Sequence, residues 1–271
     1  MAPDIGSMNE LKPNMLGTTT PHVVAVVNQK GGVGKTTTAI NLAAAMAELG
    51  HPTLLVDLDP QANSTAGLGL DPARARLNVY HLLTGDAGVE QVIQPIGADG
   101  LSVIPSHIDL AGAEIELAGM PEREGLLSQA LGATPSNIEL VLVDCPPSLG
   151  LLTLNALVAA TSMLIPTQCE YFALEGLRHL MYTHQLVRSR LNPRLAIAGI
   201  LMTQFDARTT LAWDVLNAVR RSHPHHVLET LIPRNVRISE APSHGKSVLE
   251  YDPTCRGAAE YRALAKELLE R

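Results

Sequence analysis

The chain has 271 residues and a mass of 28.9 kDa, and 46% of its residues are hydrophobic, which is enough to bury one large core and excludes disorder as the main state. Aromatic residues make up only 3%, which argues against a stacking surface for single-stranded nucleic acid. The net charge of −7 is uneven, because residues 1–170 carry 6 Lys and Arg against 17 Asp and Glu, whereas residues 171–271 carry 14 against 10. The mildly basic last part permits a local anion-binding face, although ordinary solvated helix surfaces also account for such an excess.

Residues 1–21 are rich in Pro, Gly, Asn and Thr without any period, which predicts a flexible N-terminal tail. Residues 22–271 show no linker and no repeat, so they are expected to form a single domain. There is no signal-peptide pattern and no run of 18 apolar residues. We therefore expect a cytoplasmic protein without stable membrane association.

Short apolar runs rich in β-branched residues alternate with longer helical patterns along the domain. This alternation predicts βαβ units, that is, an α/β fold with a mostly parallel twisted sheet flanked by helices on both faces. The expected strands are residues 23–27, 53–57, 101–104, 140–144, 163–166, 197–203 and 227–232. The expected helices are residues 35–49, 174–191, 211–221 and 258–269.

A glycine-rich loop, residues 28–37, lies directly between the first expected strand and the first expected helix. Gly31, Gly32 and Gly34 let backbone N–H groups converge on phosphate oxygens, and the helix N-terminus adds partial positive charge. Lys35 is then placed to reach the β and γ phosphates, and the Thr36 hydroxyl to bind Mg²⁺. The general phosphate-loop pattern requires glycine at position 29, where this chain has Gln29, followed by a second lysine, Lys30.

This variant loop resembles the deviant Walker A loop of the ParA/MinD family of P-loop ATPases. The matching residues are Lys30, Gly31, Gly32, Val33, Gly34, Lys35, Thr36 and Thr37. The likeness continues through residues 56–61, 143–148 and 232–243, and the last segment is most similar to the chromosomal ParA branch, often called Soj. The resemblance implies a three-layer P-loop NTPase fold, ATP and Mg²⁺ as cofactors, and an ATP-dependent role in partitioning a chromosome or plasmid.

Three carboxylates follow expected strands and should face the nucleotide. Asp144 ends an apolar strand, where it can hold Mg²⁺ through a water; capping of the following turn is the alternative. Alternation places Asp57 and Asp59 on one face. The resemblance implies that Asp59 orients the attacking water and that Asp57 supports the magnesium shell, while a helix-capping role remains open for Asp57.

Lys30 cannot easily fold back onto a γ-phosphate that Lys35 already holds, but it can reach a nucleotide bound to a facing subunit. In the family that the loop resembles, the matching lysine does this across an ATP-sandwich homodimer. A solvated lysine is the alternative. Gln168 and Glu170, just beyond a strand, are candidates for a switch loop.

Three cations, Arg234, Arg237 and Lys246, fall in a stretch that we expect to be loop-rich because it contains Pro233, Pro242 and Gly245. Paired across a dimer, they would contact DNA phosphates without reading bases. The resemblance implies sequence-independent binding of double-stranded DNA, association with the nucleoid and a ParB-type partner that stimulates hydrolysis. The alternative is that Arg234 or Arg237 packs near the adenine or bonds to Glu240; Pro233 and Arg234 are accordingly candidates for nucleotide binding.

Other functions remain open at this stage. A membrane-positioning ATPase of the MinD type shares the loop, but the C-terminal residues 261–271 mix charges and lack Phe and Trp. A nucleotide-sensing scaffold that does not hydrolyse ATP is a second alternative. Cysteines 145, 169 and 255 are too far apart for a disulfide framework or zinc site, and the histidines at 223, 225 and 226 predict a surface turn rather than a metal site.

Overall fold

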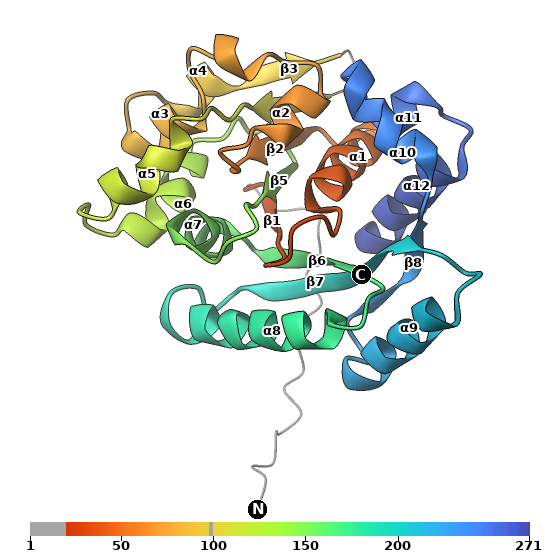
Figure 1. Cartoon of the computed structure of the whole chain (residues 1–271). Helices are drawn as coiled ribbons and strands as arrows, with labels where there is room; N and C mark the ends of the chain where they lie inside the picture. Colours follow the sequence, from red (N-terminus) through yellow and green to blue (C-terminus); the bar gives the residue numbers. More distant parts are fainter. Residues whose placement is uncertain (1–19, 98–99) are drawn as a thin grey trace, which may run out of the picture.

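The computed structural model describes residues 20–97 and 100–271, and the expected tail, residues 1–21, lies almost wholly outside the described residues. The described chain forms an eight-stranded sheet in the order β3-β4-β2-β5-β1-β6-β7-β8 (Figure 1). Every pairing is parallel except that of β3 with β4. The strands are β1 (His22–Val26), β2 (Thr53–Asp57), β3 (Gln94–Ile96), β4 (Leu101–Ile104), β5 (Leu140–Asp144), β6 (Ser162–Gln168), β7 (Ala196–Phe205) and β8 (Val227–Pro233).

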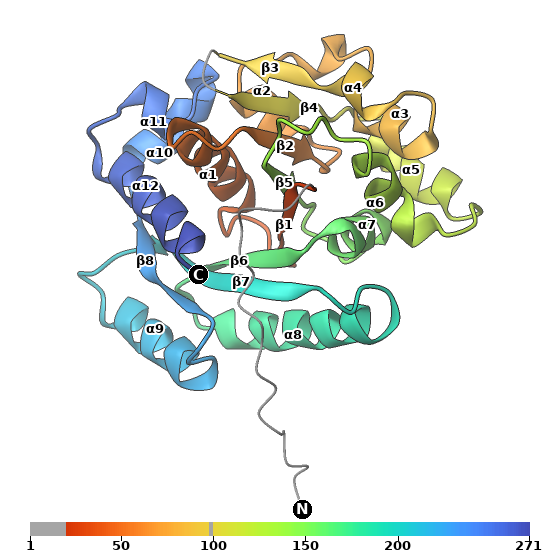
Figure 2. The same ribbon diagram turned by 180° about the vertical axis from the view of Figure 1, so that it is seen from behind.

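Helices cover both faces of the sheet, so the molecule has three layers (Figures 1 and 2). One layer holds α1 (Lys35–Glu48), α10 (Val236–Glu240), α11 (Val248–Tyr251) and α12 (Arg256–Leu269). The other holds α3 (Val79–Thr84), α4 (Val89–Val92), α5 (Leu110–Leu117), α6 (Leu126–Leu131), α7 (Leu151–Ala159), α8 (Ala173–Arg190) and α9 (Thr210–Ser222). The short α2 (Asn63–Gly67) and the 3-10 turns η1 (Pro72–Arg74), η2 (Arg123–Gly125) and η3 (Ala241–His244) complete the chain.

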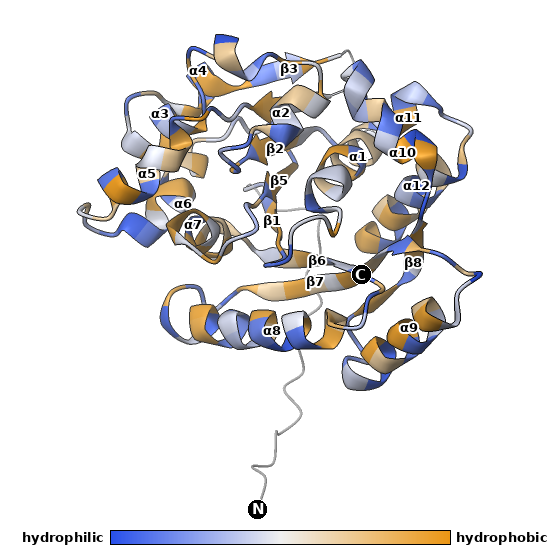
Figure 3. Ribbon diagram, viewed as in Figure 1, coloured by the Kyte–Doolittle hydropathy of each residue, from blue (hydrophilic) through white to orange (hydrophobic). Residues whose placement is uncertain are grey.

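The central strands are apolar along their whole length because both of their faces are buried. In β1, Val23 and Ala25 belong to the core under α3–α9, whereas Val24 and Val26 belong to the core under α1 and α12. The hydropathy colours of Figure 3 show this as largely orange central strands, while α8 and α9 alternate between orange and blue. Among the described residues, no helix is long and apolar enough to cross a lipid bilayer.

The predicted fold class is confirmed, and all seven expected strands and four expected helices exist with boundary shifts of a few residues. Sequence reasoning missed the edge strand β3, which contains Pro95, and it missed the short helices between β2 and β5. The stretch around the three cations is loop only in part, because α10, η3 and α11 interrupt it: Arg237 lies in α10, whereas Arg234 and Lys246 lie between elements. Asn235 and Ser247 cap α10 and α11 with their side chains, which starts helices that are too short to show a period.

His22 opens β1 and is 7% exposed, with Nε2 3.0 Å from Ser162 Oγ of the neighbouring β6. Burial lowers its pKa from 6.5 to about 4, because the protonated ring loses its hydration. The unfolded chain therefore binds more protons than the folded chain between these two values. The free energy of unfolding must fall as the pH decreases through this window.

We expect this single group to remove roughly 2 kcal/mol of stability between pH 7.5 and pH 5. Urea unfolding of the wild type and of His22→Gln at both pH values measures the contribution as the difference between the two pH dependences. The variant should lose less stability on acidification than the wild type. Parallel losses in the two proteins would show that His22 is protonated in the folded state.

Candidate nucleotide-binding site

The glycine-rich loop connects β1 to α1 at the carboxyl edge of the sheet. Gly32 and Gly34 have φ angles of 75° and 87°, in the left-handed region that glycine adopts without steric cost. Gly34 immediately precedes the first residue of α1, and no side chain caps this helix. The free N–H groups at the start of a 14-residue helix therefore face the loop, which is the arrangement that binds phosphate.

The loop is held by the ends of strands that are remote in sequence. Thr203 Oγ1 donates to the Val33 carbonyl at 2.7 Å, and Gln204 Nε2 donates to the Gly32 carbonyl at 2.7 Å. Gln204 itself has a φ of 50°, an uncommon backbone conformation for a residue other than glycine. On the β6 side, Asn28 Nδ2 donates to the Pro166 carbonyl at 2.7 Å. The bonds from Thr203 and Gln204 fix two loop carbonyls from outside, and the bond from Asn28 holds the start of the loop against β6. None of the three uses a loop N–H group.

Lys35 is 7% exposed, and its Nζ donates to the Lys30 carbonyl at 3.1 Å across the loop. Burial lowers the pKa of Lys35, while the nearby Asp144, Cys145 and Asp59 act in the opposite direction. The ammonium group thus lies inside the loop, close to carboxylates, with a hydrogen bond to a loop carbonyl. A phosphate oxygen in the loop would offer it a stronger, charge-assisted partner.

Asp57 and Asp144 end the adjacent strands β2 and β5 and are paired in register, and both are fully buried. Burial and repulsion from Asp144 raise the pKa of Asp57. Burial likewise raises the pKa of Asp144, against the lowering effect of the Thr36 and Ser64 hydroxyls. A cation next to these two buried carboxylates would stabilise their ionised forms.

A short network ties both carboxylates to the start of α2. Ser64 Oγ donates to Asp144 Oδ2 at 2.8 Å, and Thr65 donates to Asp57 Oδ2 from its N–H at 2.8 Å and from its hydroxyl at 2.7 Å. Asp57 therefore does anchor a helix N-terminus, the role left open by the sequence. Asp59 lies two residues beyond β2, is 8% exposed, and accepts from the Gln61 N–H at 2.9 Å.

The donor set fits Mg²⁺ bound together with a nucleotide. Asp144 Oδ1 is buried and has no hydrogen-bond partner among the described residues, although Oδ2 of the same carboxylate is satisfied. The Thr36 hydroxyl lies close enough to lower the pKa of this carboxylate. In the described part of the chain no three His, Cys, Asp or Glu residues form a metal cage. Mg²⁺ takes few protein ligands and completes its shell with phosphates and waters.

Lys30, at the mouth of the loop, forms an ion pair with Glu170, which lies between β6 and α8. Both side chains are about half exposed. The structure thus gives Lys30 a partner within its own chain, which neither of the two alternatives from sequence included. Gln168, the other switch-loop candidate, donates to Gln204 at 3.2 Å and so belongs to the support of the glycine-rich loop.

A cavity of about 190 Å³ opens beside Gly34 and Thr37 and extends under the segment that follows β8. Pro233 and Arg234, the candidates for nucleotide binding after β8, line it, and Thr203, Ile238 and Tyr261 line it as well. The cavity is continuous with the start of α1. Its mixed polar and apolar lining suits a base attached to phosphates held in the loop.

The three cations expected to bind DNA, Arg234, Arg237 and Lys246, all follow β8 but have different ion-pair partners. Arg237 pairs with Glu240 at 2.9 Å and with Asp252 at 3.3 Å, so the contact to Glu240 anticipated as an alternative is present. Lys246 pairs with Glu250 at 2.8 Å. Arg234 is exposed and lies close enough to Asp206 to lower its pKa.

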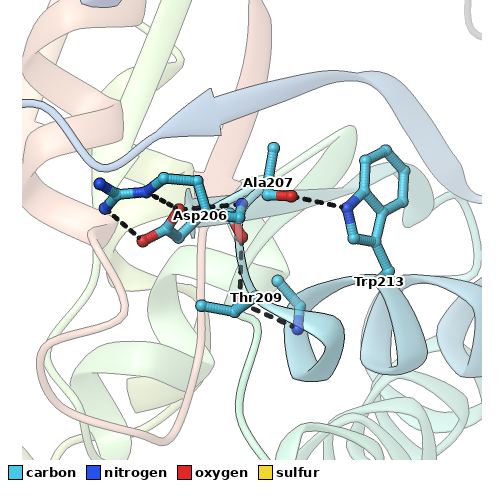
Figure 4. A network of polar contacts seen from close by, with 6 residues as sticks. Asp206, Ala207, Thr209 and Trp213 are labelled. Carbon is cyan, nitrogen blue, oxygen red and sulfur yellow. Dashed lines mark hydrogen bonds and ion pairs between the residues drawn. The ribbon is translucent and has the colours of Figure 1, made fainter.

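Figure 4 shows the loop between β7 and α9, which adds a cation that sequence reasoning missed. Arg208 is bonded to Asp206 at 2.7 Å and, together with Arg234, holds the pKa of that carboxyl at about 2. Thr209 donates to the Asp206 carbonyl at 3.0 Å, and Trp213 Nε1 donates to the Ala207 carbonyl at 3.0 Å. The loop is therefore ordered by its own side chains and presents Arg208 at the rim of the site.

The remaining overlooked residues are polar: Ser64 and Thr65 lie in α2, and Thr203, Gln204 and Ser106 lie at or just beyond the ends of β7 and β4. That position at the carboxyl edge of a parallel sheet was the available signal. The three cysteines are free, and Cys145 is buried, with a pKa raised by that burial.

Most of this chain matches a known protein family and several named relatives. Residues 21–197 match the family model AAA_31, described as an AAA domain. The sporulation initiation inhibitor protein Soj of Bacillus subtilis is 52% identical over 246 residues, which covers 91% of this chain and 97% of Soj. The chromosome partitioning protein ParA of Myxococcus xanthus is 47% identical over 253 residues, covering 93% of this chain and 89% of ParA.

Among solved structures, cobyrinic acid a,c-diamide synthase from Mycobacterium smegmatis with a bound ATP analogue and magnesium superposes with a TM-score of 0.82. It is 39% identical in sequence, and the match covers 93% of this chain and 95% of that chain.

The left-handed glycine of the loop can be tested with a matched pair of substitutions. Gly34→Ala forces a side chain into a φ of 87° and should lower the free energy of unfolding by about 1 kcal/mol. Gly31→Ala should change it by less than about 0.5 kcal/mol, because Gly31 has no positive φ and a Cβ at this position would meet no neighbouring atom within 4 Å. Urea unfolding of both variants measures the difference, and equal effects would contradict the assigned loop geometry.

Proposed function

The chain belongs to the ParA/Soj family of P-loop ATPases, and on this premise we propose that it is a Mg²⁺-dependent ATPase of chromosome or plasmid partitioning whose ATP-bound homodimer binds DNA. The observation that carries the proposal is the juxtaposition of Lys35, the unpartnered Asp144 oxygen and the uncapped start of α1 at one edge of the sheet. Each of these three features has polar groups that a metal-bound triphosphate would satisfy.

The ATP-binding roles follow from the contacts described above. The N–H groups from Gly31 to Thr37 hold the phosphates, and Lys35 exchanges its bond to the Lys30 carbonyl for a phosphate oxygen. Pro233 and Arg234 flank the base in the cavity beside Gly34. Thr36, Asp57 and Asp144 would hold Mg²⁺, which supplies positive charge next to the phosphate oxygens when bound.

Hydrolysis requires a group that orients water at the γ-phosphate. Asp59 suits this role because it is nearly buried, lies close to Lys35, and keeps its carboxylate in place by accepting from the Gln61 N–H. Its carbonyl accepts from Ser106 Oγ at 2.7 Å, which fixes the backbone. A positioned carboxylate can align a nucleophile without itself being consumed.

Lys30 is proposed to act on the nucleotide of a second copy. Its own chain already supplies Lys35 to the phosphates, and Lys30 lies at the exposed mouth of the loop. Positive charge supplied in trans to a phosphoryl transition state can accelerate the reaction about 10³- to 10⁵-fold. ATP would then stabilise a face-to-face homodimer, and hydrolysis would release it.

The DNA-binding proposal rests on cations gathered at one edge. Arg234, Arg237 and Lys246 follow β8, and Arg208 adds to the same rim. Dimerisation doubles the set, so a dimer holds DNA phosphates that a monomer releases. Such contacts are independent of base sequence, which suits association with the nucleoid, and a ParB-type partner would set the time of release by stimulating hydrolysis.

One observation weighs against the membrane-positioning alternative. The C-terminal helix α12 turns its apolar side chains inward, and Tyr261, Leu264 and Leu268 are at most 1% exposed. An interfacial helix needs that face for lipid. The scaffold alternative, which binds ATP without hydrolysis, is separated from the ATPase by phosphate release.

The switch is tested with Asp59→Ala and Lys35→Ala. We expect Asp59→Ala to bind ATP, to remain dimeric and to stay on nonspecific DNA, because the nucleotide persists. We expect Lys35→Ala to lose nucleotide binding. Sedimentation with ATP, Mg²⁺ and DNA, together with phosphate release, checks both. A monomeric Asp59→Ala protein at saturating ATP would contradict the proposal.

Salt dependence tests the DNA contacts. With Arg234, Arg237 and Lys246 of both subunits engaged, six cations per dimer, the logarithm of the DNA affinity should fall by about 5 for each tenfold increase in salt. Arg237→Ala removes two contacts per dimer and should reduce this slope by about 2. Arg74→Ala, a change at an exposed and paired cation on η1, is the control and should leave the slope unchanged. An unchanged slope in Arg237→Ala would remove that residue from the interface.

A further inference from the structure

The ion pair between Lys30 and Glu170 involves a lysine to which the proposed function gives a role in another subunit. Glu170 lies two residues beyond the end of β6, in the short connection to α8. The side chains of Lys30 and Glu170 are 47% and 43% exposed, so the pair lies at the surface and can open without disturbing the core.

The rest of Lys30 is held more firmly than its side chain. Its N–H donates to Asn28 Oδ1 at 3.0 Å, and its carbonyl accepts from Lys35 Nζ at 3.1 Å. The backbone of Glu170 is fixed in a similar way, since its N–H donates to the Gln168 carbonyl and its carbonyl accepts from the Ala173 N–H. Opening the pair is therefore a movement of two side chains on fixed backbones.

We infer that Glu170 is a positioning residue that holds Lys30 within its own subunit in the absence of a dimer and thereby opposes dimerisation. This inference rests on the proposed function. The same ammonium group cannot contact Glu170 and the phosphates of a facing nucleotide at full strength. Each subunit must therefore give up one Lys30–Glu170 pair when the dimer forms.

The size of the effect follows from the exposure of the pair. Surface ion pairs contribute about 0.2–1 kcal/mol each, and two are exchanged per dimer. Removal of the carboxylate should therefore lower the dimer dissociation constant about twofold to thirtyfold. A triphosphate carries several negative charges, so it competes successfully with a single half-exposed carboxylate.

The test measures the dimer dissociation constant by sedimentation equilibrium with a nonhydrolysable ATP analogue and Mg²⁺. Glu170→Gln should dimerise more tightly than the wild type, and Glu170→Asp, which retains the charge, should lie between them. Glu229→Gln is the matched control, because it neutralises an exposed glutamate paired with Arg220 far from the loop. The control should leave the constant unchanged.

A second measurement tests whether Glu170 engages the Lys30 amine in the nucleotide-free monomer. Lys30 should react more rapidly with an amine-acylating reagent in Glu170→Gln than in the wild type, as followed by peptide mass spectrometry, while the exposed Lys266 serves as internal reference. A merely structural role for Glu170 would alter unfolding but would not change this ratio. Unfolding by urea controls for a fold defect.

The outcomes are distinct. Tighter dimers of Glu170→Gln with faster acylation of Lys30 support the inference. A wild-type dimer whose dissociation constant is unchanged or raised by Glu170→Gln overturns it and leaves the proposed function intact. A wild-type protein that stays monomeric with the analogue overturns the proposed function, and this inference with it.

Discussion

The structure depends on the burial of two carboxylates, Asp57 and Asp144, on neighbouring strands. Parallel strands in register end at the same edge, so residues of like charge at the ends of β2 and β5 cannot avoid each other. Hydroxyl and N–H donors from Ser64 and Thr65 bind the two carboxylates, and the buried ammonium group of Lys35 lies close to Asp144. These partners are incomplete, since one oxygen of Asp144 remains without a donor among the described residues. The proposed Mg²⁺ and triphosphate would complete the set.

The glycine-rich loop and the strand ends were predictable from sequence because their signals are local. A strand, a run of glycines and a helix stand in consecutive residues, and Asp57, Asp59 and Asp144 directly follow apolar strands. The supports of the loop were not predictable, because Thr203 and Gln204 are about 170 residues away and their role depends on β7 lying near β1 through β6. The short helices after β8 escaped prediction for a different reason, since they depend on caps and packing rather than on a period.

The overall charge of −7 does not describe the surface around the carboxyl ends of β7 and β8, where several cations lie. Cations at this edge are balanced locally, with Arg208 on Asp206 and Lys246 on Glu250. DNA binding would therefore exchange carboxylates for phosphates at nearly fixed positions rather than recruit free cations. Such an exchange costs little per contact and is strongly dependent on salt, which favours rapid release once the number of contacts is halved.

Lys30 would make the same exchange of a carboxylate for a phosphate, with the nucleotide in place of DNA. Its pairing with Glu170 keeps a positive charge from standing unbalanced at the mouth of the loop, yet both side chains are half exposed, so water can solvate each of them after separation. A buried pair would be costly to break and would hold the chain in one state. In the proposed dimer, a half-exposed pair would instead contribute a small bias against association, which a multiply charged ligand in a facing subunit would overcome. In the proposed switch, the loss of one phosphate would return Lys30 to Glu170, because the backbones of both residues stay fixed.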